Sequence, residues 1–150
     1  MKLEDEIKQV KAFRNEYSKA IVNLIFTYNW FNSYSKAFFI EFDITSQQFN
    51  ILRILRGQHP QPSTINLLKD RMLDKMSDAS RLVERLLIKG LVERTKATSD
   101  KRAVDIYISS KGEQLLSKID LKMPFFEDQF NTLSKDELVT LNMLLDKLRG

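Results

Sequence analysis

The sequence has no cysteine among its 150 residues, which excludes disulfide bonds, thiol redox sensing and cysteine-ligated zinc. Its only histidine, His59, lies in the proline-containing stretch GQHPQPS, where a metal site is not expected. No apolar run approaches the roughly 18 residues of a membrane span. The charged start MKLEDEIKQV lacks the apolar region of a signal peptide. We expect a cytoplasmic protein that uses no metal, cofactor or membrane.

Glycine and proline are scarce, with four and three copies, so no glycine-rich phosphate loop can be recognised. No catalytic residue is predicted, because no histidine lies near the polar group Ser77, Asp78 and Ser80 to act as a base. The sequence therefore does not favour an enzyme. Hydrophobic residues make up 43% of the chain, which is enough for a folded core.

The positive charge of the chain is concentrated in one third of it. Residues 63–112 hold eleven lysines and arginines and seven acidic residues. The difference, +4, equals the net charge of the whole chain. The remainder is neutral. A localised excess of this kind suits an acidic partner such as nucleic acid, although a solvated face with scattered charges would give the same count.

The N-terminal part predicts helices. Residues 3–39 contain no glycine or proline and have dense apolar spacing, which predicts one long helix. Its second half is strongly aromatic and should be buried on more than one side. Thr45 and Gln48 can form a capping box that opens the next helix, and Gly57 should end that helix.

The basic third predicts two more helices and a pair of strands. Ser63 or Thr64 should cap a short helix, and Ser77 a helix over residues 78–89 that Gly90 ends. Residues 91–95 then predict one strand. The second strand is predicted by apolar residues that alternate with polar ones, namely Val104, Ile106 and Ile108.

The C-terminal part predicts two further helices. Ser110 with Glu113, and Ser134 with Glu137, have the spacing of capping boxes. Pro124 should kink or break the first of these helices. The whole order is mainly α with a small β-hairpin, and a short helix, a turn, a second helix and a hairpin are typical of a winged helix-turn-helix.

In that fold the second helix enters the major groove and presents its first turns to base edges. Arg81 could bind guanine through two hydrogen bonds, although an ion pair with Glu84 is the alternative. Ser77 could serve as a cap only. The predicted DNA-contacting residues of this helix are Ser77, Asp78, Ser80, Arg81 and Arg85.

The hairpin tip is the second predicted DNA contact. Lys96, Lys101 and Arg102 could reach the adjacent minor groove, where narrow A·T-rich sequence concentrates negative potential. Asp100 could hold the guanidinium of Arg102 and fix the shape of the wing. The alternative is that the segment is a solvated turn.

The stretch from Ser77 to Leu116 resembles MarR-family transcriptional regulators. The resemblance is carried by KGLVER at residues 89–94, DKR at 100–102 and ISSKG at 108–112, where the family's usual threonine is Ser109. It implies a homodimer that binds double-stranded DNA at a pseudo-palindromic site and represses until a small aromatic or anionic ligand binds. It also implies three parts: residues 1–40 for dimerisation and part of the core, 41–110 for DNA binding, and 111–150 for dimerisation.

Apolar residues at both ends of the chain support the dimer independently, with Phe125, Leu141 and Leu145 among them. They could instead complete the core of a monomer. An effector pocket is hypothesised from aromatic residues and one cation, although such aromatics are more often core; its predicted lining is Trp30, Phe31, Tyr34, Phe49 and Arg53.

Two functions compete with DNA-binding regulation by this fold. A winged helix can serve purely as a protein–protein adaptor, and the salt dependence of DNA binding would discriminate between the two. A redox-sensing regulator of the same family would have to use methionine oxidation, because the sequence contains no cysteine thiol.

Overall fold

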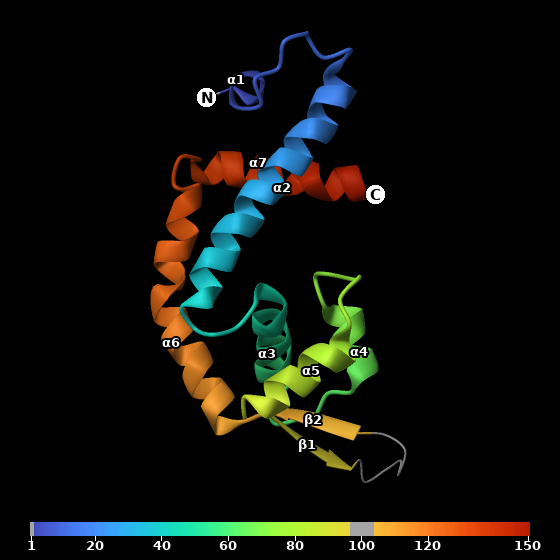
Figure 1. Cartoon of the computed structure of the whole chain (residues 1–150), viewed down its shortest axis with the longest axis vertical. Coiled ribbons are helices and arrows are strands. Elements are labelled where there is room, and N and C mark those ends of the chain that lie inside the picture. Colours follow the sequence, from blue (N-terminus) through green and yellow to red (C-terminus); the bar gives the residue numbers. More distant parts are fainter. Residues whose placement is uncertain (1, 97–103) are drawn as a thin grey trace. The chain divides into compact units, whose positions relative to one another are not determined.

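The computed structural model describes residues 2–96 and 104–150. The chain forms two compact units, Met1–Ser46 and Gln47–Gly150 (Figure 1). The prediction of a mainly helical protein with one small hairpin is confirmed.

The first unit contains two helices rather than the single long helix that we predicted. α1 spans Leu3–Glu6, and α2 spans Glu16–Ile40. Lys8 adopts a left-handed conformation with φ of 53°, which an α-helix does not accommodate. A new helix then starts where the side chain of Asn15 accepts a hydrogen bond from the backbone N–H of Ser18 at 2.9 Å.

The aromatic half of α2 is buried only near its C-terminal end. Phe38 and Phe39 are buried, and their rings meet edge to face with centroids 5.1 Å apart. By contrast, Tyr28 is 64% exposed and Trp30 is 45% exposed. The expectation of burial on several sides is therefore wrong for the middle of this helix.

The second unit holds the helix-turn-helix, the hairpin and the C-terminal helices. Its helices are α3 (Ser46–Gln58), α4 (Ile65–Arg71), α5 (Ala79–Ile88), α6 (Ser110–Glu127), a 3-10 turn (Asp128–Phe130) and α7 (Lys135–Arg149). The side chains with almost no exposed surface come from α3 to α6 and define one core: Ile51, Leu52, Leu55, Leu68, Met72, Val83, Leu86, Ile106, Leu116 and Ile119.

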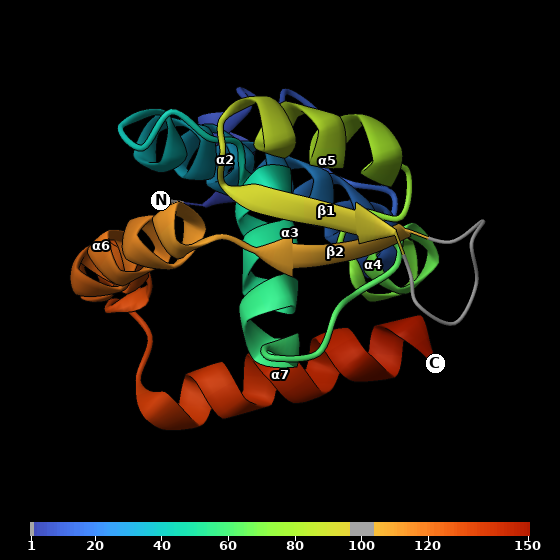
Figure 2. The same cartoon turned by 90° about the horizontal axis from the view of Figure 1, so that it is seen from below.

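The hairpin consists of β1 (Val92–Lys96) and β2 (Val104–Ile108), paired antiparallel with Val92 opposite Ile108. Figure 2 shows α5 lying alongside β1. Ser63 forms an isolated β-bridge to this hairpin, because it exchanges two backbone hydrogen bonds of 2.9 Å with Ile106. A bridge of one residue leaves no alternating pattern in the sequence, so it was not predicted.

Several predicted helix ends are confirmed. Thr64 caps α4 by accepting from the N–H of Leu67, and Ser134 with Glu137 forms a complete capping box at α7. Gly90 follows α5 with φ of 69°, the left-handed conformation that favours glycine after a helix.

Other predicted ends are wrong. Asp78, not Ser77, caps α5, and Ser109, not Ser110, caps α6. Gly57 lies inside α3, where one unfavourable residue does not outweigh the buried apolar face of the helix. α6 continues through Pro124, which removes one backbone hydrogen bond, while Ile119 and Phe126 are buried on either side of it.

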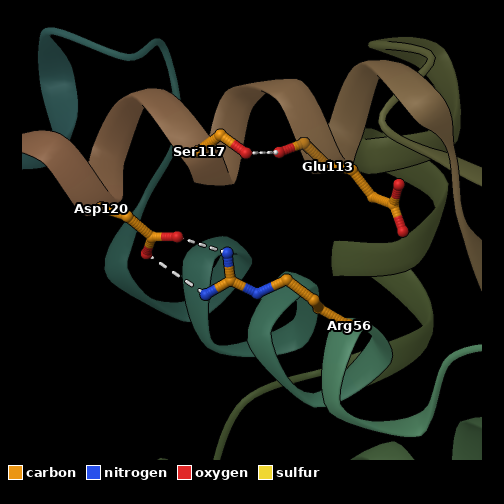
Figure 3. Close-up of polar contacts among 4 residues, drawn as sticks. All are labelled: Arg56, Glu113, Ser117 and Asp120. Atoms are coloured by element: carbon orange, nitrogen blue, oxygen red, sulfur yellow. Dashed lines mark hydrogen bonds and ion pairs between the residues drawn. The ribbon is translucent and has the colours of Figure 1, made fainter.

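An ion pair joins α3 to α6 within the second unit (Figure 3). Nη1 of Arg56 lies 2.6 Å from Oδ2 of Asp120, and Nη2 lies 3.2 Å from Oδ1. The hydrogen bonds from this guanidinium hold the pKa of Asp120 below its ordinary value of 3.8. Beside the pair, the hydroxyl of Ser117 donates to the backbone carbonyl of Glu113.

We expect Asp120→Asn to destabilise the protein by about 0.5–1 kcal/mol at neutral pH, because the pair is two-pronged but half exposed. A lowered pKa means that the ionised carboxylate contributes stability above pH 3.8, and that this contribution disappears as the pH falls through the folded-state pKa. Thermal melts at pH 7 and pH 3 should show a smaller difference from wild type at the lower pH.

Asp146→Asn is the matched control, since Asp146 pairs with Arg149 on a far more exposed part of α7. Its melting temperature should equal that of wild type at both pH values. An Asp120→Asn variant that is equally neutral at pH 7 would contradict a stabilising role for the link between α3 and α6.

Candidate nucleic-acid interface

α4 and α5 form the helix-turn-helix, and Asp74 shapes the turn between them. The carboxylate of Asp74 accepts a hydrogen bond from the hydroxyl of Ser77 at 2.7 Å and one from the N–H of Met76 at 3.0 Å. These bonds, that of Ser77 first, hold the pKa of Asp74 below its ordinary value. The N–H of Leu73 donates to Oδ1 of Asn50 on α3 at 2.9 Å, which fastens the turn to the core.

Two of the predicted DNA-contacting residues have local structural bonds. The hydroxyl of Ser77 donates to Asp74, and the carboxylate of Asp78 accepts from the N–H of Arg81 at 3.0 Å. Asp78 is therefore the N-cap of α5. Both side chains help to set the direction of this helix, and we had not predicted the part played by Asp74.

The outer face of α5 is cationic. Ala79, Val83 and Leu86 are buried. The helical period places Arg81 and Arg85 on the opposite side and Ser80 on its flank, and all three are exposed. Within the described residues, no carboxylate lies within ion-pair distance of Arg81 or Arg85.

Glu84, the carboxylate that might have paired with Arg81, is engaged elsewhere. Its Oε1 lies 2.6 Å from Nη1 of Arg94 on β1. This pair connects the outer face of α5 to the hairpin. The consequence is that Arg81 keeps its full hydrogen-bonding fork available for an external anion.

The wing is described only in part. Lys96 ends β1 and is exposed. The other predicted tip residues, Asp100, Lys101 and Arg102, lie outside the described residues.

The hypothesised effector pocket draws on both units. Trp30, Phe31 and Tyr34 lie on α2 in the first unit. Phe49 and Arg53 lie on α3 in the second unit, where the guanidinium carbon of Arg53 is 5.9 Å from the centroid of the Phe49 ring. This pocket stays a prediction.

Residues 44–104, which run from just before α3 through the helix-turn-helix and β1 to the first residue of β2, match the sequence profile of the MarR family. This region of the chain is similar to MarR-family transcriptional regulators. The resemblance found in the signature residues is thereby confirmed, and so is the winged helix-turn-helix fold.

One relative is the HTH-type transcriptional regulator YsmB of Bacillus subtilis, which is 29% identical over 87 residues. That match covers 57% of this chain and 60% of YsmB. A MarR-like regulator from Bacillus cereus has the same fold, with a TM-score of 0.79 at 21% identity over 89% of this chain and 96% of its own. A mutant MarR from Escherichia coli, solved in complex with operator DNA, has a TM-score of 0.75 at 25% identity over 100% of both chains.

The MarR signature residues form a set of hydrogen bonds that we call the junction clamp: residues 89–91 after α5, held by residues 109–112 at the start of α6. The hydroxyl of Ser109 donates to the carbonyl of Gly90 at 2.7 Å and accepts from the N–H of Gly112 at 3.0 Å. Nζ of Lys111 donates to the carbonyl of Lys89 at 2.7 Å. The clamp thus fixes the end of α5, a role that sequence reasoning did not assign to these residues.

The described part of the chain offers neither a cluster of metal-ligating side chains nor a membrane-spanning helix. Its described residues contain no group of three or more histidine, aspartate or glutamate side chains that could hold a metal ion. Among them, no helix is long and apolar enough to cross a membrane.

Proposed function

We propose that the chain is a transcriptional regulator that binds a pseudo-palindromic DNA site as a homodimer, with α5 in the major groove. The observation that carries the proposal is the exposed pair Arg81 and Arg85, which has no carboxylate partner among the described residues and lies on the outer face of a helix whose inner face is buried. DNA phosphates and guanine edges are the partners that such an arginine pair recognises. The operator complex of the E. coli relative supports the same use of the fold.

The proposed DNA surface extends from α5 to the wing. Ser80 lies beside the two arginines, and Lys96 adds a cation at the end of β1. The proposal also includes Lys101 and Arg102 as DNA-contacting cations, with the acidic Asp100 next to them in sequence; all three lie outside the described residues. Ser77 and Asp78 contribute mainly by capping and turn geometry, so their substitution should act through the placement of α5.

The same proposal assigns parts of the chain to roles. Residues 41–110 bind DNA, and residues 1–40 and 111–150 form the dimer. A small aromatic or anionic ligand near Trp30, Phe31, Tyr34, Phe49 and Arg53 relieves repression. The chain acts in the cytoplasm, where its DNA is, and catalyses no reaction.

Arg81→Ala should weaken binding to a labelled DNA duplex by about 1–3 kcal/mol when the duplex contains the operator. Loss of one phosphate-neutralising charge would also make the salt dependence shallower by about one unit of slope. Fluorescence anisotropy across a salt series measures both quantities. Stability should not change, because Arg81 is exposed and its side chain makes no ion pair with the described residues.

Lys118→Ala is the control, since it removes one positive charge from an exposed position of α6. Its affinity should stay within about twofold of wild type. If wild type itself binds no duplex even at low salt, DNA regulation is wrong and a protein–protein adaptor becomes the leading function. Equal losses in both variants would instead show that only net charge matters, and not the face of α5.

A further inference from the structure

A cavity of about 530 Å³ lies between α1 and the N-terminal half of α2, entirely within the first unit. It exists because the chain breaks after α1 and folds that short helix back beside α2, which the prediction of one continuous helix had not allowed. Its lining residues are Lys2, Leu3, Glu4, Glu6, Lys19, Asn23, Phe26, Thr27 and Trp30.

The α2 wall of the cavity is one continuous helical face. Lys19, Asn23, Phe26, Thr27 and Trp30 follow the spacing that places residues on the same side of a helix. Two aromatic rings and two small polar groups therefore face the same space. A cavity of this size with mixed apolar and polar walls is suited to a small organic molecule.

Glu4 supplies the polar anchor of the α1 wall. Its Oε1 lies 2.6 Å from Nζ of Lys19. Its Oε2 is shielded from solvent, and no donor among the described residues reaches it. A shielded carboxylate oxygen without a donor is unfavourable, so a ligand that donates an N–H to it would gain this bond at little cost. The bond from Lys19 lowers the pKa of Glu4, which keeps the carboxylate ionised at neutral pH.

The lining as a whole is neutral, with Lys2 and Lys19 against Glu4 and Glu6, but the shielded Oε2 of Glu4 favours a cation over an anion at this point. The ammonium of Lys19 is already paired with Glu4. An anionic ligand would bring a second acceptor toward the acceptor-only Oε2, and the two would repel each other. An ammonium ligand would instead pair with this oxygen, and a cation beside Trp30 and Phe26 is also attracted by the aromatic rings.

We propose that the α1–α2 cavity is a binding site for a small aromatic amine. The ring of the ligand lies against Phe26 and Trp30, and its ammonium group donates to Oε2 of Glu4. This site shares Trp30 with the hypothesised effector pocket but none of that pocket's other four residues, and it differs in the charge of its ligand.

The site is also separate from the proposed dimer surface on α2. Five exposed apolar residues of this helix recur with a helical period on the side opposite the cavity wall: Tyr17, Ile21, Leu24, Ile25 and Tyr28. A second copy of the chain packed on that stripe would leave the cavity face of the helix uncovered. The proposed amine site therefore depends neither on the dimer surface nor on DNA binding.

Trp30 is the only tryptophan in the chain, so its fluorescence reports directly on the cavity. In a titration of the full-length protein with phenethylamine, we expect a saturable change in this fluorescence. Phenylacetate, of similar size but opposite charge, should produce none. Glu4→Gln should raise the dissociation constant for phenethylamine about tenfold or more.

Three further variants make the test decisive. Asp5→Asn removes the same charge from α1 outside the cavity lining and should bind like wild type. Asn23→Phe places a large side chain in the cavity from the α2 side and should abolish phenethylamine binding. It tests the site without a change in α1, the helix that Glu4→Gln alters. Arg53→Ala should bind like wild type. The proposal is overturned if phenethylamine gives no saturable change, if phenylacetate binds equally well, or if Arg53→Ala loses binding while Asn23→Phe keeps it.

Discussion

Gly112→Ala should lower the melting temperature by about 2–12 °C. A Cβ at Gly112 would lie 2.2 Å from the backbone oxygen of Leu91 and 2.8 Å from a side-chain carbon of Ile108. The Leu91 carbonyl cannot move freely, because it accepts the N–H of Ser109 in the junction clamp. Overpacking of this kind costs about 1–3 kcal/mol, and each kcal/mol is worth about 2–4 °C in a chain of this size.

Gly57→Ala is the matched control for this substitution. Gly57 lies inside α3, and a Cβ there would meet nothing within 4 Å. Alanine should therefore raise stability by about 0.5–1 kcal/mol, since it suits a helix interior better than glycine. Thermal melts followed by circular dichroism compare the two variants. A Gly112→Ala protein with the same melting temperature as wild type would mean that the junction clamp accommodates the methyl group without loss of stability. The glycine of the signature would then have another purpose.

The helix order and several helix ends could be predicted from sequence because their signals are local. Thr64, Ser134 and Gly90 act through bonds or backbone angles that involve only the next few residues. The phase of the apolar residues in α5 likewise predicted which side is buried. That phase also placed Arg81 and Arg85 on the outer face, as the structure describes.

The errors arise where the signal is not local or is ambiguous. Two adjacent serines precede the α6 sequence, and the choice of Ser109 as cap is coupled to its bond with Gly90, which is distant in sequence. Lys8 carries no residue-type preference for a left-handed conformation, so the break after α1 was invisible. The α1–α2 cavity, which depends on that break, could not have been predicted.

Sequence analysis assigned the cap of α5 to the wrong residue for a related reason. Ser77, Asp78 and Asp74 are all capable of capping or turn bonds, and sequence alone ranks them nearly equally. The structure gives the cap to Asp78 and the turn to Asp74. Identification of a residue as polar and close to the start of α5 was thus easier than assignment of its partner.

The second large effect concerns the proposed dimer. α7 has no buried residue in the single chain, and its stripe of leucines includes Leu141 at 37%, Leu144 at 53% and Leu148 at 65% exposure. An apolar stripe of this length is usually covered by a partner. We expect Leu141→Glu with Leu145→Glu to raise the dimer dissociation constant at least 100-fold, because each carboxylate would be buried without a partner.

Sedimentation velocity of the purified variant measures this change directly. The control is Thr140→Glu with Lys147→Gln, which lowers the net charge equally but away from the leucine stripe of α7. The control should sediment as wild type. A leucine variant that still sediments as a dimer would place the interface on another surface, such as the apolar stripe of α2.

The same pair of variants separates two contributions to DNA affinity. Each variant lowers the net charge by two, so each should weaken binding to any duplex through the loss of electrostatic attraction. Only the leucine variant also loses the second DNA-binding unit, and simultaneous engagement of two half-sites is worth about 10²–10⁴ in affinity. On a palindromic duplex the leucine variant should therefore bind far more weakly than the control, whereas on a single half-site the two should bind alike. Equal affinities on both duplexes would mean that each chain binds DNA on its own, and that the apolar stripe of α7 serves something other than operator recognition.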